Sequence, residues 1–121
     1  MIQHVALETR RADVDACVAF WALLGFARVE PPPSLATRAA WVQEPGGTQV
    51  HLLYAEAPVV MPEGHVAVVA RDYEATLARL RAAGVEVDER TRHWGVPRSV
   101  VVAPGGHRVE VMASAPVQPQ P

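Results

Sequence analysis

An internal repeat limits the possible folds of this chain more than any other feature. The segment EPGGTQVHLL at residues 44–53 returns as APGGHRVEVM at residues 103–112, 59 positions later. The same offset relates Asp13 to Asp72. Nearer the N-terminus the offset is 61 and pairs QHVAL with GHVAV. A long period that occurs only twice does not fit a solenoid, so the repeat predicts two copies of one folded module.

Each copy carries the signals of a strand, a helix and three further strands. HVAL and HVAV are typical of short strands. Asp13 and Asp72 are predicted N-caps, because a short carboxylate can accept hydrogen bonds from the first free helix N–H groups. Apolar residues then recur at helical spacing until Gly25 and Gly84, which suit the left-handed residue that closes a helix. FARVE or VEVDE follows as a strand, and a hairpin that turns on PGG completes the module.

The predicted fold class is therefore α+β, with two tandem βαβββ modules in a single domain of residues 1–113. The first module covers residues 1–56 and the second covers residues 63–113, with a linker around APVVMPEG. Residues 114–121 are rich in proline and are predicted to form a flexible tail.

The alternation of side chains along the strands separates one apolar face from one polar face. In four strands, valine and leucine residues share a face that the helices are expected to cover. The opposite face carries one histidine or glutamate on each strand: His4, His51, His65 and Glu110. The repeat delivers these four side chains to equivalent places in the two modules, as expected for the lining of a cavity.

Three imidazoles and a carboxylate on rigid strands form a ligand set for one divalent transition metal. Zn, Ni, Co, Mn and Fe all suit such a set. The alternative is that each histidine is an ordinary hydrogen-bonded residue of the core or surface.

Composition excludes several other classes of function. The formal net charge of −2 provides no basic surface for nucleic acid or for an anionic membrane. All eleven basic residues are arginines, which excludes lysine-based Schiff-base chemistry. No apolar stretch is long enough to span a bilayer, and the N-terminus does not resemble a signal peptide, so a cytoplasmic location is expected. Cys17 lies in a helical apolar pattern and is predicted to be a core residue rather than a nucleophile.

Several segments resemble the vicinal oxygen chelate superfamily, which includes glyoxalase I, bleomycin-resistance proteins and extradiol dioxygenases. HVAL is similar to the first ligand strand of that superfamily, and CVAFWALLGFARVE to its helix that ends in LGF. GHVAVVA resembles the strand that opens the second module, and WGVPRSVVVAPGGHRVEVM the closing hairpin. The resemblance covers almost the whole chain.

The resemblance implies curved, partly closed mixed sheets around a central cavity, with one divalent metal ion at each site. It places His4, His65 and Glu110 on ligand positions. It also implies a small-molecule substrate and a homodimer in which each site is shared between chains. The implied activity is a metal-dependent lyase or isomerase of the glyoxalase type, in which the metal chelates vicinal oxygens and Glu110 moves a proton.

His51 departs from the glyoxalase I pattern, which has glutamate or glutamine at that position. Only Glu110 is then left as a carboxylate base. Two alternatives stay open: a ring-cleaving dioxygenase of the extradiol type, and a non-catalytic protein that binds a drug or metabolite.

Three further residues are candidates for substrate binding. Arg98 could hold an anionic group of the substrate, and Trp94 could form a wall of the cleft. Trp41 is a candidate for the same role as Trp94. The alternative is a solvated arginine and packing tryptophans. His107 is expected to face solvent, His93 to lie in an exposed loop and Trp21 to belong to the core.

Overall fold

The computed structural model describes residues 1–117, which contain two four-stranded sheets and two α-helices. The chain divides into two compact units. One consists of Met1–Pro62 with Ala103–His107, and the other of Glu63–Val102 with the residues from Arg108 onward. The predicted flexible tail lies partly outside the described residues, and the single domain of residues 1–113 stays a prediction.

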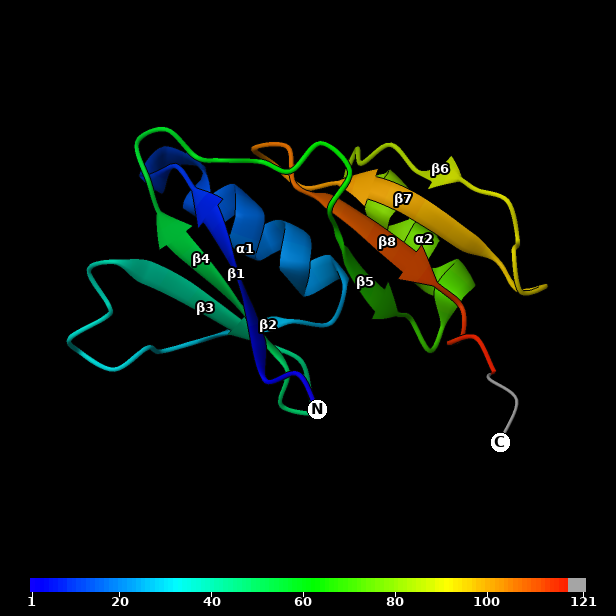
Figure 1. Cartoon of the computed structure of the whole chain (residues 1–121), viewed down its shortest axis with the longest axis horizontal. Coiled ribbons are helices and arrows are strands. Elements are labelled where there is room, and N and C mark those ends of the chain that lie inside the picture. The colour runs from blue at the N-terminus through cyan, green and yellow to red at the C-terminus, as the bar shows by residue number, and fades with distance from the viewer. Residues whose placement is uncertain (118–121) are drawn as a thin grey trace. The chain divides into compact units, whose positions relative to one another are not determined.

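The first module contains one helix and one mixed sheet (Figure 1). The sheet has the order β1-β4-β3-β2, with β1 parallel to β4 and the other pairs antiparallel. Its elements are β1 (His4–Thr9), a 3-10 turn (Arg11–Asp13), α1 (Val14–Leu23), β2 (Ala27–Val29), β3 (Ala39–Gln43) and β4 (Gln49–Tyr54).

The second module repeats this topology in the order β5-β8-β7-β6. The register repeats as well, since Ala6 pairs with His51 in the first sheet and Ala67 with Glu110 in the second. Its elements are β5 (Val66–Val69), α2 (Tyr73–Ala82), β6 (Asp88–Glu89), β7 (Arg98–Val102) and β8 (Arg108–Met112). The α+β class and the two tandem modules are thus confirmed. Each sheet is open rather than closed into a barrel, and the shared central cavity stays a prediction.

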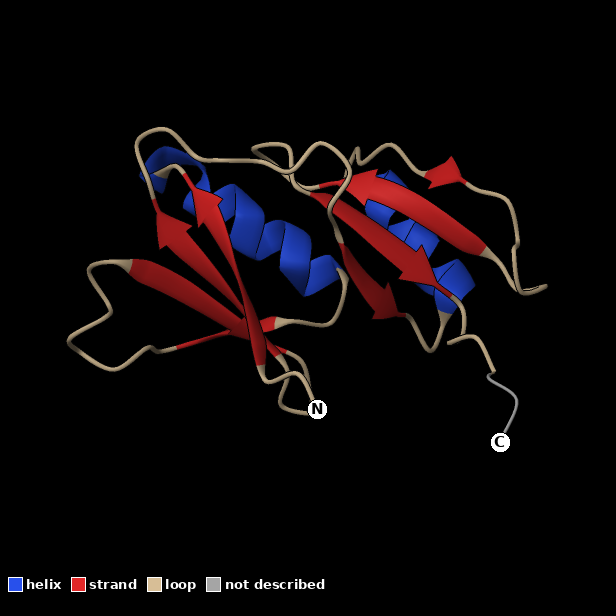
Figure 2. Cartoon of the chain, in the orientation of Figure 1, coloured by secondary structure: helices blue, strands red, loops and turns tan. Residues whose placement is uncertain are grey.

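In each module the helix lies on one face of its sheet (Figure 2). The apolar residues of the central strands are buried, as the alternation predicted: Val50, Leu52, Val109 and Val111 are at most 1% exposed. The helices bury Val14, Cys17, Phe20 and Trp21 in the first module and Tyr73, Thr76, Leu77 and Leu80 in the second. This burial fixes the opposite sheet face as the place for His51 and Glu110.

The helix ends agree with the prediction in three places of four. Gly25 and Gly84 have φ angles of 90° and 81°, in the left-handed region that glycine adopts without strain. The Asp72 side chain accepts a hydrogen bond from the Ala75 N–H at 3.2 Å, as an N-cap does. The prediction for Asp13 is wrong, because its side chain makes no capping hydrogen bond. The preceding 3-10 turn places its backbone in the helical region, whereas a capping residue is normally extended.

Two strand boundaries also differ from the prediction. β6 contains only Asp88 and Glu89 of the predicted VEVDE strand. β5 begins at Val66, so His65 lies immediately before the strand and not within it. None of the helices within residues 1–117 has the length and apolar character that crossing a membrane would require.

Candidate functional site

The second module brings His65 and Glu110 together. Glu110 lies on β8 and is 7% exposed, whereas His65 precedes β5 and is exposed. His65 Nε2 lies 3.2 Å from Glu110 Oε1. The parallel pairing of β5 with β8 produces this contact, because it sets Ala67 opposite Glu110.

The hydrogen bonds of His65 make this pair a fit for a cation. Its Nδ1 lies 2.9 Å from the backbone oxygen of Glu63, which can only accept, so Nδ1 carries a proton. In the neutral ring, Nε2 then presents a lone pair to the carboxylate of Glu110. A proton or a metal ion between the two groups resolves this repulsion. Two ligand atoms at about 2.1 Å from one metal and at right angles are about 3.0 Å apart, close to the observed separation.

Arg98 occupies the other oxygen of Glu110. Its Nε donates to Glu110 Oε2 at 3.0 Å, and its Nη1 donates to the backbone oxygen of Thr91 at 3.0 Å. The guanidinium carbon lies 5.8 Å from the ring centre of Trp94. Trp94 donates in turn from Nε1 to the backbone oxygen of Ser114 at 3.2 Å. The two predicted substrate-binding residues are therefore in contact with each other and, through Arg98, with Glu110.

These neighbours set the ionisation of Glu110. Burial alone would raise the pKa of the carboxyl group, but the hydrogen bond and charge of Arg98, with those of His65, outweigh burial and lower the pKa. Glu110 is therefore ionised at neutral pH. The stability that these contacts add is complete above the ordinary carboxyl pKa and is lost as pH falls through the lowered one.

The first module stacks three rings on the corresponding sheet face. The His51 ring lies between those of His4 and Trp41, with ring centres 4.0 Å away on each side. The planes are nearly parallel, at 11° to His4 and 2° to Trp41. The strand register explains the arrangement, because Trp41 on β3 is directly opposite His51 on β4. His51 is 8% exposed, while His4 is exposed at the start of β1.

A hydrogen-bond chain holds the buried His51 ring from one side. Its Nε2 lies 2.8 Å from Gln49 Oε1, and Gln49 Nε2 donates to Gln43 Oε1 at 2.7 Å. Nε2 is therefore the protonated nitrogen of a neutral His51, and Nδ1 keeps the lone pair. Burial, followed by the charge of His4, lowers the pKa of His51 and favours this neutral form.

The two histidines of the first module do not converge on one point as the two groups of the second module do. The lone pairs of parallel stacked rings lie in two separate planes, here with ring centres 4.0 Å apart. A shared cation would require one ring to turn. His4 is better placed than His51 to turn, since it is exposed and its Nδ1 contacts the neighbouring Gln3 side chain, at 2.7 Å.

The lowered pKa of His51 leads to a prediction for the metal-free protein. The unfolded chain takes up a proton at His51 near its ordinary pKa of about 6.5, whereas the folded chain resists it. The free energy of unfolding should therefore fall as pH drops below that value. Replacing His51 by glutamine should flatten this dependence between pH 7 and pH 5 in urea denaturation, whereas His93→Gln in the exposed loop should leave it unchanged. Equal slopes for wild type and His51→Gln would contradict the prediction.

The four predicted metal ligands thus form two pairs, one in each module. Among residues 1–117, no group of three or more His, Cys, Asp and Glu side chains is placed to hold a metal ion. The assembly of both pairs around one ion stays a prediction.

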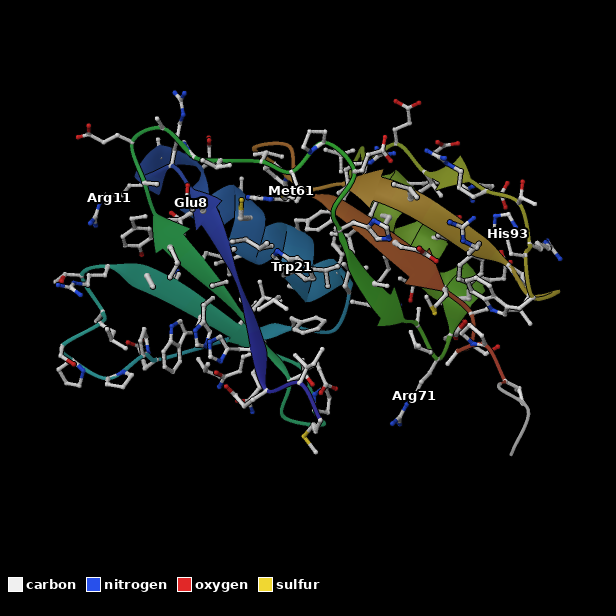
Figure 3. The ribbon with its side chains drawn as sticks, in the orientation of Figure 1. Glu8, Arg11, Trp21, Met61, Arg71 and His93 are labelled. Atoms are coloured by element: carbon white, nitrogen blue, oxygen red, sulfur yellow. The ribbon has the colours of Figure 1, made fainter. Side chains whose placement is uncertain are left out.

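The remaining candidates are settled by their surroundings. Cys17 is 2% exposed and donates to the backbone oxygen of Pro104 at 3.1 Å. Burial and then the charge of Asp13 raise the pKa of its thiol, so the core assignment is sound. His93 lies in the exposed loop before β7 (Figure 3). The prediction that His107 faces solvent is wrong, because its ring is half-buried and its Nε2 contacts the backbone oxygen of Glu8 at 2.7 Å.

Sequence reasoning did not assign a role to Gln49 or to the backbone oxygens of Glu63 and Thr91. Gln49 was detectable, because it lies two residues before His51 on the same strand face. The backbone acceptors give no signal in the residue types, since every residue carries one.

Comparison with known proteins gives the family. The glyoxalase-like domain family matches residues 4–112. The chain therefore belongs to this family, and the resemblance to the vicinal oxygen chelate superfamily is confirmed. No curated protein matches the sequence significantly.

Three solved structures illustrate the fold. A protein from Bacillus anthracis described as a member of the glyoxalase family is 23% identical, with a TM-score of 0.82 and 93% of each chain covered. A glutamate-to-glutamine mutant of the fosfomycin resistance protein FosX from Listeria monocytogenes, in complex with Mn(II) and dihydroxypropylphosphonic acid, is 16% identical, with a TM-score of 0.71 and 95% of this chain and 93% of that chain covered. A lactoylglutathione lyase from Agrobacterium tumefaciens is 20% identical, with a TM-score of 0.68 and coverages of 93% and 92%. At these identities the likeness shows a shared fold.

Proposed function

We propose that this protein is a metal-dependent enzyme of the glyoxalase type that carries out a lyase or isomerase reaction on a small molecule. His4, His51, His65 and Glu110 would hold one divalent metal ion. Glu110, partly released from the metal, would also move a proton, and Trp41, Trp94 and Arg98 would contact the substrate. We also propose that the protein is a homodimer in which each site is shared between the two chains, and that it is located in the cytoplasm.

The observation that carries this proposal is the approach of His65 Nε2 to Glu110 Oε1 at 3.2 Å. The contact of Nδ1 with the Glu63 carbonyl orients the ring so that Nε2 faces the carboxylate. A metal-ligating histidine typically donates its other N–H to a backbone carbonyl or a carboxylate in this way. The FosX structure supports the proposal further, because that protein has the same fold and is in complex with Mn(II).

A bound metal would supply Lewis acidity toward two neighbouring oxygens of a substrate. The residues of this chain supply the other requirements. Neutral His51 adds no charge to the site. Glu110 is ionised and can accept a proton, and the lowered pKa makes it a weak base. It therefore suits a substrate with an acidic C–H next to a carbonyl group.

Metal analysis of protein purified without a histidine tag tests this proposal. We expect about one divalent metal ion per chain by mass spectrometry of the digested protein. Dialysis against a chelator should remove the metal, and Mn(II), Zn(II) or Ni(II) should restore it. Wild-type protein that binds none of these ions in calorimetry at millimolar concentrations would refute the metal-dependent function.

The ring stack favours a second function, in which the protein sequesters a planar drug or metabolite without turnover. Trp41, His51 and His4 present a flat aromatic surface, on which a planar ligand could stack. Ligand binding by chelator-treated protein, together with its loss in Trp41→Ala, would favour this alternative. Binding that requires the metal would favour the enzyme.

A further inference from the structure

The contacts of Arg98 point to a role in addition to the substrate contact proposed for it. We propose that Arg98 is a positioning residue that fixes Glu110 as a metal ligand through a single oxygen atom. The inference rests on the proposed metal site. It assigns to Arg98 the task of occupying Oε2, so that Oε1 alone faces His65 and the cation.

The contacts of Arg98 show that it is itself held in place. Its side chain is 15% exposed and has two bonds in different directions, from Nε to Glu110 and from Nη1 to the Thr91 backbone. The ring of Trp94 lies beside the guanidinium and is tied to the backbone of Ser114. A guanidinium fixed at two nitrogens gives its partner a defined direction, which a freely rotating surface arginine would not.

The strand register places Arg98 beside Glu110 on one face of the second sheet. Arg98 on β7 pairs with Met112 on β8, and Val100 pairs with Glu110. Arg98 is therefore the diagonal neighbour of Glu110 on the same sheet face. The equivalent residue of the first module, 59 positions earlier, is Ala39, and the equivalent of Glu110 is His51. The module that has the carboxylate of Glu110 thus has an arginine at the neighbouring position. The module that has the neutral ring of His51 has an alanine there, so the arginine accompanies the carboxylate.

Fixing one oxygen has a consequence for the metal site. A carboxylate with both oxygens free can bind a cation through one or both of them. Because Oε2 accepts from Arg98 at 3.0 Å and Oε1 lies 3.2 Å from His65 Nε2, Glu110 offers one atom in one direction. A ligand that takes one coordination position leaves more positions for substrate oxygens. It also loses less freedom when the cation binds.

A double-mutant cycle on metal affinity tests this role. The variants are Arg98→Met, Glu110→Gln and the double variant, and calorimetry of the untagged full chain gives the Kd for Mn(II) and Zn(II). Arg98→Met is expected to weaken binding by about 10- to 100-fold, the usual effect of losing a partner that orients a ligand. In the Glu110→Gln background the same change should alter Kd by less than about 3-fold, because the group that Arg98 orients has already changed. Arg90→Met serves as the matched control, since Arg90 pairs with the exposed Asp88 at 2.8 Å.

Arg98→Lys separates positioning from charge. Lysine keeps the positive charge but has no fork to contact Glu110 and Thr91 together, so we expect weakened binding. If Arg98 acts only through its charge, Arg98→Lys will match wild type, and Arg98→Met will tighten binding in both backgrounds. Either result would overturn the inference.

A readout without metal keeps the inference testable if the proposed function fails. Crystal structures of metal-free wild type and Arg98→Lys should show Glu110 turned away from its wild-type direction in the variant. An unchanged Glu110 would sink the positioning role. If wild-type protein binds no metal but Glu110 is displaced in Arg98→Lys, the proposed metal site is refuted. The conclusion that Arg98 orients Glu110 would then still hold.

Discussion

Replacing Glu110 by glutamine is expected to weaken the binding of Mn(II) or Zn(II) by at least about 100-fold and to abolish any metal-dependent turnover. The loss of an outer partner of a metal ligand typically costs about 10- to 100-fold in affinity, so loss of a charged ligand should cost more. The amide keeps the shape of the side chain and an oxygen that can accept from Arg98. It removes the negative charge and the only proposed base. Calorimetry and steady-state rates on metal-loaded protein measure the two effects.

Glu89→Gln provides the matched control for this prediction. Glu89 lies in the same module at the end of β6 and is exposed, so the same chemical change should leave metal affinity within about 2-fold of wild type. Similar circular dichroism spectra for both variants would show that the fold is retained. If Glu110→Gln binds metal as tightly as wild type, Glu110 is not a metal ligand. The proposed metal site would then have no carboxylate ligand.

The sequence predicted the fold well because the repeat fixes more than the number of modules. Pairing His51 with Glu110 at an offset of 59 also pairs their strand registers, which the structure reproduces as Ala6 opposite His51 and Ala67 opposite Glu110. A period of two along each strand then determines which side chains face the helix. These rules depend on the backbone alone, so one sequence is enough to apply them.

The candidate site was predictable only as far as the same backbone rules extend. They place four side chains on the polar faces, but the contacts of each side chain depend on its rotamer and on its neighbours. The stack of His51 between His4 and Trp41 requires all three rings to adopt compatible rotamers. The bond between Arg98 and Glu110 requires a long side chain to reach diagonally across two strands. Neither arrangement leaves a periodic signal in the sequence.

Replacing Trp21 by alanine is expected to lower the free energy of unfolding of the first module by about 3–5 kcal/mol. Trp21 is 1% exposed and lies on α1, as Figure 3 shows. Its ring makes edge contacts with Phe20 and Phe26, at centre distances of 5.6 Å and 5.3 Å. Alanine would leave a cavity among these rings that the rigid sheet cannot fill. Because small domains have total stabilities of about 5–15 kcal/mol, this loss would remove a large share of the stability of the fold. Urea denaturation and amide hydrogen exchange in β1, β3 and β4 measure the effect.

Trp41→Ala is the matched comparison, because it makes the same chemical change in the same module on the opposite face of the sheet. Trp41 is half-buried and its main ring partner is His51, so the lost stack should cost about 0.5–1.5 kcal/mol in addition to the lost burial. Because part of the ring is already exposed, we expect a smaller total loss than for Trp21→Ala. Its larger effect is expected on ligand binding, because it removes one side of the ring stack. Trp21→Ala, in contrast, should lower the stability of the module without changing the affinity of the molecules that remain folded. Equal losses of stability in the two variants would show that the stacked face, and not only the helix-covered face, holds the first module together.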